Sequence, residues 1–239
     1  MAVAALGLCV PGTALAQSTT APSGGDQIGA LTQSAETALA AGRFEEAASL
    51  YRRLVQIDPK QWRFQRGLGD AVLRLGQYDD ALKAYDAALA VLQSATPSTL
   101  TPRQRDIEMS TIYKYELGAY LKLHRPADAA AAGEKSAALN PSADAYFNLC
   151  AMYYNQGQTD GALRACDRTI VLDPKRADAY FIKGSLLLGS AATGTDGKVH
   201  VPAGTVEALR KYLELAPNGA HRGDVQQMLD YVASQGPNH

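Results

Sequence analysis

Apolar residues and glycines recur along this 239-residue chain with a step of 34 positions. The same residue types occur in two successive copies, first at Gly42, Phe44, Ala47 and Tyr51 and then at Gly76, Tyr78, Ala81 and Tyr85. A period of this length predicts helix pairs that bury their apolar faces only by stacking on neighbouring pairs. We therefore expect an all-α chain that acts through the shape of an extended surface, and not an enzyme.

The order of these residues resembles the tetratricopeptide repeat (TPR) family. Each copy carries a glycine, an aromatic residue, an alanine and a second aromatic residue, and prolines such as Pro59 and Pro174 close a copy. The resemblance covers roughly residues 28–235 and implies a right-handed superhelical solenoid of antiparallel helix pairs. Within a domain at 28–239, we place about five repeats at 28–61, 62–95, 111–142, 143–176 and 177–217.

Two insertions interrupt the repeats, near residues 96–110 and 190–205. In the first, we expect an exposed loop and then a helix that begins near Pro102 with Thr101 as its cap. In the second, the Asp196-Gly197 pair predicts either a small hairpin or a disordered loop. A polar stretch at 223–234 predicts a capping helix that closes the array.

The N-terminus has the pattern of an export signal. Ala2–Val10 is an apolar run, and Ala14-Leu15-Ala16 is a small-x-small cleavage site, so we predict a signal peptide at 1–16 that is cleaved after Ala16. No lysine or arginine precedes Arg43, which leaves open a start inside a longer signal, and a buried N-terminal helix is the alternative. Residues 17–27 then form a flexible linker. The predicted location is periplasmic or secreted.

Charge and composition exclude several classes of partner. The formal net charge is −1, so no long-range field attracts nucleic acid or an anionic membrane. Outside the N-terminal run, no apolar stretch is long enough to span a bilayer, and we expect no stable membrane insertion. We expect no cofactor, metal site or catalytic residues, because phosphate-loop spacings are absent and the histidines are scattered. They are His124, His200, His221 and His239.

Two cysteines fall within the repeat at 143–176. Cys150 and Cys166 occupy its positions 8 and 24, which face each other across a pair of antiparallel helices. Export would place them in an oxidising compartment, where disulfides persist. The alternatives are a disulfide within this repeat or two buried thiols that pack as small core residues.

The family resemblance also implies a concave face lined by the first helix of each repeat. Its binding positions are 2, 5, 9, 12 and 13, and we take Gly69, Gly118, Cys150 and Gly184 as position 8. The predicted groove residues are Arg63, Arg66, Arg74, Tyr115, Lys122, Phe147, Tyr154, Asn155, Phe181 and Leu188. Aromatic residues among polar groups suit an extended peptide or a partner helix. The alternative is that Tyr115, Phe147 and Phe181 pack as core, which a register error of one residue would produce.

These residues together predict a non-catalytic scaffold or adaptor in the cell envelope that binds a peptide or helix of another protein in its groove. The alternative is a periplasmic carrier of a small molecule or glycan in the solenoid cavity. TPR proteins that bind chaperone tails conventionally have lysine at position 5, and this register gives only Arg66 as a basic residue there. Binding of a terminal carboxylate is therefore disfavoured, although Arg63 and Arg66 leave it open as an alternative.

Overall fold

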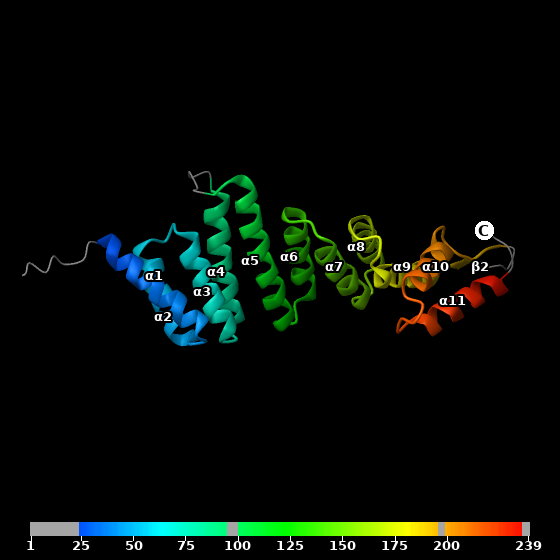
Figure 1. The fold of residues 1–239 in the computed structure, drawn as a ribbon, viewed down its shortest axis with the longest axis horizontal. Coiled ribbons are helices and arrows are strands. Elements are labelled where there is room, and N and C mark those ends of the chain that lie inside the picture. Colours follow the sequence, from blue (N-terminus) through cyan, green and yellow to red (C-terminus); the bar gives the residue numbers. More distant parts are fainter. Residues whose placement is uncertain (1–23, 95–99, 196–198, 236–239) are drawn as a thin grey trace, which may run out of the picture.

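The structure is a computed structural model that describes residues 24–94, 100–195 and 199–235. Within these ranges the chain forms helices and one short hairpin, in the order shown in Figure 1. The helices are α1 (Gly24–Ala40), α2 (Phe44–Ile57), α3 (Trp62–Arg74), α4 (Tyr78–Gln93), α5 (Pro102–Lys122), α6 (Pro126–Leu139), α7 (Ala143–Asn155), α8 (Thr159–Leu172), α9 (Ala177–Gly189), α10 (Thr205–Leu215) and α11 (Arg222–Ser234).

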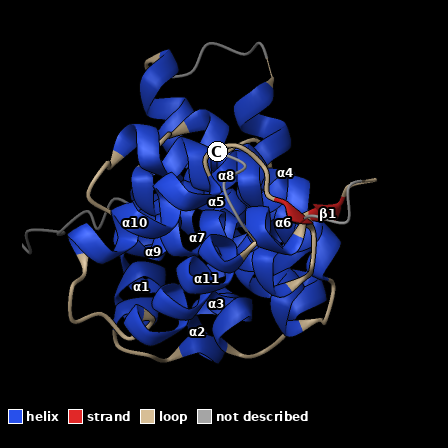
Figure 2. Ribbon diagram, turned by 90° about the vertical axis from the view of Figure 1, so that its right-hand side faces the viewer, coloured by secondary structure: helices blue, strands red, loops and turns tan. Residues whose placement is uncertain are grey.

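Each helix packs against the next along the chain, so the molecule is a row of antiparallel helix pairs. The row extends from α1 at one end to α11 at the other (Figure 1), and the helices overlap around a common axis when the row is viewed end-on (Figure 2). This arrangement confirms the predicted all-α, right-handed superhelical solenoid.

Turns inside the helix pairs fix where each repeat begins. Gly42, Gly76 and Gly157 sit at these turns with φ of 75°, 76° and 68°. Among the described residues, His124 is the non-glycine residue with positive φ, at 55°. Its backbone N donates to the Leu121 carbonyl at 3.1 Å, and Gly157 donates to Tyr154 at the same distance. His124 is therefore the turn residue of the α5–α6 pair, in a conformation that costs least for glycine.

In each of four helix pairs, the two helices come close together at one position. There a glycine on one helix faces a larger side chain on the other, or two cysteines face each other. In the α3–α4 pair, a Cβ built on Gly69 would lie 2.5 Å from the Tyr85 ring. The α5–α6 pair reverses this order, because a Cβ built on Gly133 would lie 2.9 Å from Leu117. The remaining contacts are the Cys150–Cys166 disulfide in α7–α8 and Gly184 against Leu209 in α9–α10.

The start of the array differs from the predicted boundary. Helix α1 begins at Gly24, so residues 24–27, which we predicted as flexible linker, are helical. Asp26 lies in the first turn, where a carboxylate interacts favourably with the helix dipole. The predicted signal peptide at 1–16 lies outside the described residues.

The first insertion extends helix α5. Its N-cap is Thr101, as predicted, and Gln104 completes a capping box. The Gln104 backbone N donates to Thr101 Oγ1 at 3.3 Å, and the Thr101 backbone N donates to Gln104 Oε1 at 2.9 Å. The loop expected before it falls partly on residues 95–99, which lie outside the described range.

The second insertion contains the hairpin that was one of the two predictions. Strand β1 (Ala192–Thr193) pairs antiparallel with β2 (Val199–His200), and the Asp196-Gly197 turn lies outside the described residues. Helix α10 follows and packs against α11, which covers the end of the array near the predicted range of 223–234. Buried Leu209, Tyr212 and Val225 form the core of this cap.

Candidate functional site

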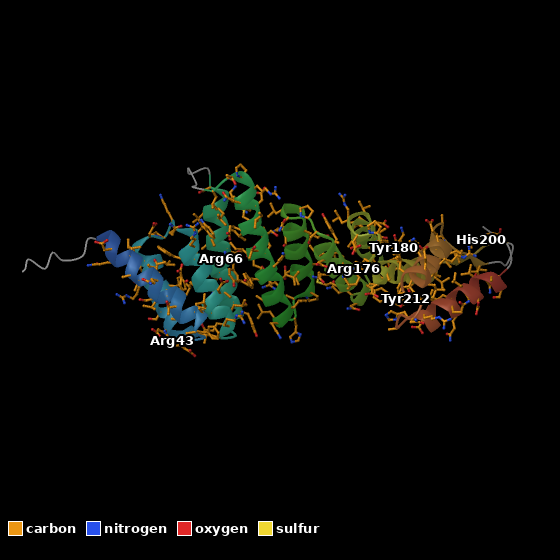
Figure 3. All side chains as sticks on the ribbon, in the orientation of Figure 1. Arg43, Arg66, Arg176, Tyr180, His200 and Tyr212 are labelled. Carbon is orange, nitrogen blue, oxygen red and sulfur yellow. A yellow bond between two sulfur atoms is a disulfide. The ribbon has the colours of Figure 1, made fainter. Side chains whose placement is uncertain are left out.

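The predicted groove residues lie on the first helices of four pairs, α3, α5, α7 and α9. We call the surface formed by these helices the A-helix face. Figure 3 shows the side chains along the whole row, with Arg66 on α3 labelled and Arg176 just before α9. The described geometry divides this face into three regions, between α3 and α5, between α5 and α7, and from α7 to the C-terminal cap.

The register of α5 corrects one predicted site residue. Position 5 lies ten residues before the turn residue, which gives Arg66 before Gly76 and Phe147 before Gly157. The same count from His124 gives Lys114 and not Tyr115. Our prediction was anchored on Gly118, but a Cβ built there would meet nothing within 4 Å, so Gly118 is not the close-packed position 8. The helix is shifted by one residue from the predicted register.

Tyr115 instead stacks on the preceding helix pair. Its ring centroid lies 5.9 Å from that of Tyr85 on α4, with an angle of 14° between the planes. The Tyr115 residue is still 37% exposed. It therefore covers the α3–α4 pair and leaves position 5 of this repeat to Lys114.

The region between α3 and α5 contains a polar network. Arg66 Nη1 lies 2.6 Å from Glu108 Oε2, and Arg66 Nε lies 3.6 Å from Asp70 Oδ2. The Tyr85 hydroxyl donates to Asp70 Oδ1 at 2.8 Å. Burial raises the pKa of Asp70, against the lowering effects of the Tyr85 hydrogen bond and of the Arg66 charge. We call Arg66, Glu108, Asp70 and Tyr85 the Arg66 network. Its ion pairs engage Arg66, the residue that we predicted to face a ligand.

The aromatic residues of α7 and α9 are covered by other groups. The Arg176 guanidinium lies 5.1 Å over the Phe147 ring and also pairs with Asp144. Phe181 stacks on His221 with ring centroids 3.9 Å apart and an interplanar angle of 2°. Both phenylalanines are half-buried. The three predicted aromatic anchors therefore do not form one continuous exposed row.

The region between α5 and α7 contains a groove of about 680 Å³. We call it the α5–α7 groove. Its walls and floor are Lys114, Leu117 and Leu121 from α5, Gly133 and Ser136 from α6, and Ala145, Asn148, Leu149, Ala151, Met152, Asn155 and Gln156 from α7 and its C-cap. Most of the side chains that line it are apolar or small, and the polar ones are Lys114, three amides and one hydroxyl.

Gly133 is the glycine of α6 that lines this groove. It occupies the position that holds Tyr85 in the α3–α4 pair, nine residues after the turn residue. A glycine there leaves only the ends of Leu117 and Leu149 over α6, each 2.9 Å from where a Cβ would lie. Leu117 and Leu149 therefore close over Gly133 and form part of the apolar lining of the groove.

Of the other predicted groove residues, Asn155 lines the α5–α7 groove, and the remainder lie on the first helices of their pairs outside its lining. Arg63 is exposed, with its guanidinium 5.1 Å from the Trp62 ring centroid. Arg74 and Lys122 are exposed, Tyr154 is 37% exposed and Leu188 is half-buried. Sequence reasoning missed Lys114, Leu117 and Leu121, although the unusual turn at His124 carried the signal that would have found them.

Cys150 and Cys166 form a disulfide, with Cα atoms 5.0 Å apart, which selects one of the two predicted states. It joins α7, which forms one wall of the groove, to α8. In the described part of the chain, no group of three or more histidine, cysteine, aspartate or glutamate residues could hold a metal ion. No described helix is both long and apolar enough to cross a membrane.

Helix pairs that stack in a row, with a groove between neighbouring first helices, are the architecture of a helical-repeat solenoid. Tetratricopeptide repeat profiles match residues 32–98 and 143–176, which cover α1 to α4 and the α7–α8 pair. The chain is a tetratricopeptide repeat protein. No curated protein sequence matches it significantly.

Solved structures of TPR proteins share this fold. MamA is 22% identical, with a TM-score of 0.57 over 81% of this chain and 93% of its own. YrrB, described as a TPR protein with an unusual peptide-binding site, is 18% identical, with a TM-score of 0.54 over 81% of this chain and 88% of its own. A TPR repeats protein from Bacteroides fragilis is 15% identical, with a TM-score of 0.53 over 87% of this chain and 98% of its own.

Proposed function

We propose that this TPR protein is a non-catalytic scaffold that binds a segment of another protein in the α5–α7 groove. The groove itself is the observation that supports this proposal. It offers about 680 Å³ beside an otherwise continuous row of helices, within the size range of ligand sites. TPR proteins are in general protein-interaction scaffolds, and YrrB, which shares the fold, is described as having a peptide-binding site.

The lining of the groove specifies the chemistry of the partner segment. Leu117, Leu149 and Met152 would bury one or two apolar side chains, and methionine adapts easily to different shapes. Asn148 and Asn155 can each donate and accept, which suits the backbone of an extended peptide. Lys114 makes no ion pair with any described residue, so an acidic group of the partner beside the apolar side chains would pair with it.

We further propose that the protein acts in the cell envelope. The apolar run Ala2–Val10 and the cleavage pattern at Ala14-Leu15-Ala16 support export. The Cys150–Cys166 disulfide supports the same location, because disulfides persist in oxidising compartments such as the periplasm. The partner would then be an envelope or secreted protein.

A variant that fills the groove tests the proposal. Ala151, a small residue on the groove wall, is changed to tryptophan, and the tagged protein is used to capture partners from envelope fractions. The matched control is Val171→Trp on α8, where the side chain is 72% exposed and outside the groove. We expect one partner to be captured by wild type and by Val171→Trp and lost from Ala151→Trp, with all three proteins equally helical by circular dichroism.

Retention of the partner by Ala151→Trp would contradict binding in the groove. Native mass spectrometry of the purified protein separates the scaffold from the alternative carrier. A small molecule or glycan that co-purifies with wild type and is lost from Ala151→Trp would favour the carrier.

A further inference from the structure

A second hollow lies between α4, α5 and α6, with a volume of about 310 Å³. We call it the acidic pocket, because three of the four charged residues that line it are carboxylic acids. Its polar lining consists mainly of Asp86 from α4, Tyr113, Glu116 and Tyr120 from α5, and Asp128 and Lys135 from α6. The groove described above uses the α5 residues that follow these by one position, so the two sites lie about 100° apart around one helix.

The charges in this pocket do not balance. Asp128 is paired with Arg125, whose Nε lies 2.8 Å from Asp128 Oδ2. Lys135 Nζ lies 5.2 Å from the centroid of the Tyr113 ring and makes no ion pair within the described residues. Neither Asp86 nor Glu116 has a cationic partner within 4.0 Å in the same part of the chain. Two carboxyl groups thus face one lysine that contacts neither of them.

Glu116 and Arg66 each have a buried side-chain atom without a hydrogen-bond partner among the described residues, and of the two only Glu116 also lacks an ion pair there. It is only 4% exposed, and its buried Oε1 has no hydrogen-bond partner. Burial and, to a smaller extent, the charge of Asp86 raise its pKa to about 7, against the lowering effect of Lys135. An unpaired buried carboxylate is costly, and a donor that reached it would recover much of that cost.

The chemistry of the missing donor follows from the rest of the lining. In the described residues, the carboxylates do not come together as a group of three that could hold a metal ion. A pocket of this volume accommodates an alkyl chain, and the faces of Tyr113 and Tyr120 attract an organic cation. Each ring already attracts a cation of this chain, because Lys135 Nζ lies 5.2 Å from the Tyr113 ring centroid and the Arg125 guanidinium lies 4.8 Å from the Tyr120 ring centroid.

We propose that the acidic pocket binds a primary alkylammonium group, which donates hydrogen bonds to Glu116 and Asp86 beside the rings of Tyr113 and Tyr120. The group belongs either to a free amine or to a lysine side chain of a partner protein. This site is separate from the α5–α7 groove, so either proposal can fail without the other.

Isothermal titration calorimetry with 1,5-diaminopentane tests the proposal on the full chain. We expect saturable binding to wild type and a loss of about tenfold or more in affinity for Asp86→Asn/Glu116→Gln, which keeps the shape of the pocket and removes its charge. The matched control is Asp160→Asn, which removes an exposed charge from α8 and should bind like wild type. Pentan-1-ol, which lacks the ammonium group, should not bind.

The pH dependence sharpens the same experiment. Affinity should rise from about pH 6 to about pH 8 as Glu116 ionises, in a pocket whose other titratable side chains are Asp86, Asp128, Lys135, Tyr113 and Tyr120. A variant with Glu116→Gln alone should lose this pH dependence. Equal affinity of wild type and the double variant for 1,5-diaminopentane would overturn the proposal.

Two peptides distinguish the source of the ammonium group. The first is acetyl-Gly-Lys-Gly-amide, and the second carries norleucine in place of lysine. Binding of the lysine peptide alone would assign the pocket to a partner protein, whereas binding of the diamine alone would assign it to a free amine. If wild type binds neither the diamine nor the lysine peptide, the proposal is wrong.

Discussion

Two neighbouring regions of the A-helix face use the same repeat positions in opposite ways. Between α3 and α5, Arg66 is held by Glu108 and Asp70, and Tyr85 bonds to Asp70. Between α5 and α7, the corresponding side chains leave a groove of about 680 Å³. A charged residue at a repeat position that binds ligands in the family need not bind one itself. In this protein, Arg66 holds neighbouring helices together instead.

The difference can be traced to one exchange in the core of the helix pairs. The α3–α4 pair has Gly69 facing Tyr85, whereas the α5–α6 pair has Leu117 facing Gly133. Tyr85 reaches Asp70 with its hydroxyl and so joins the Arg66 network, whereas Gly133 has no side chain and is covered by Leu117 and Leu149. The predictions that follow break or sharpen this comparison, beginning with the largest expected effect.

The close packing of Gly69 should be the most sensitive to change. A Cβ there would lie 2.5 Å from the Tyr85 ring, so Gly69→Leu should lower the free energy of unfolding by about 3 kcal/mol. Gly118→Leu is the matched control, because a Cβ there meets nothing within 4 Å and leucine favours helix. It should raise stability by up to about 1 kcal/mol. Urea unfolding measures both, and equal effects of the two changes would contradict the assigned register.

The Cys150–Cys166 disulfide links α7 to α8. Its contribution to the free energy of unfolding should be similar in size to the effect of Gly69→Leu. Changing Cys150 and Cys166 together to serine should lower the free energy of unfolding by about 3 kcal/mol, because the open chain gains entropy in the unfolded state. Urea unfolding with and without reductant measures this. Reductant should destabilise wild type and leave the serine variant unchanged; a wild type indifferent to reductant would indicate free thiols.

Glu116 should make the stability of the protein depend on pH. Its pKa is about 7 in the folded protein against an ordinary value of 4.5, so the folded state holds a proton that the unfolded state releases. Stability should therefore fall as pH rises between these values. Glu116→Gln should raise the free energy of unfolding by about 1–3 kcal/mol near pH 8, with little effect near pH 5. Thermal unfolding across this range measures the difference, with Glu36→Gln, an exposed site on α1, as the control.

The Arg66 network should contribute little to stability and nothing to partner binding. Arg66 and Glu108 are about 30% exposed, so a double-mutant cycle to alanine should give a coupling energy of about 1 kcal/mol or less. Lys114→Ala, at the same repeat position on α5, should weaken partner binding instead. If Arg66→Ala weakened partner binding and Lys114→Ala did not, the assignment of partner binding to the α5–α7 groove and of packing to the Arg66 network would be contradicted.

The repeat period predicted the fold because helix pairs that must stack leave a regular trace in the sequence. The cap at Thr101 and the cysteine pair at Cys150 and Cys166 were visible for similar reasons, since local rules position them. The register of α5 was missed because His124 takes a backbone conformation that the other turns give to glycine. A prediction anchored on that turn, and not on Gly118, would have placed Lys114 correctly.

The groove was harder to predict from the sequence. It lies where α5, α6 and α7 come together, and the assembly of these helices is a property of the stacked repeats. The coverage of Phe181 by His221 likewise joins α9 to the residue that precedes α11, a contact that no repeat pattern contains. Position within a repeat therefore identified the right helices but not the open part of their surface.

Photo-cross-linking in intact cells tests the central claim most directly. A benzoyl-phenylalanine residue is placed at Leu121, which is 45% exposed in the groove, or at Val171, which is 72% exposed on α8. We predict one cross-linked partner protein from position 121 that is lost when Ala151→Trp fills the groove, and none from position 171. An unchanged cross-link in the filled variant, or the same partner captured from position 171, would show that the α5–α7 groove is not where this protein binds.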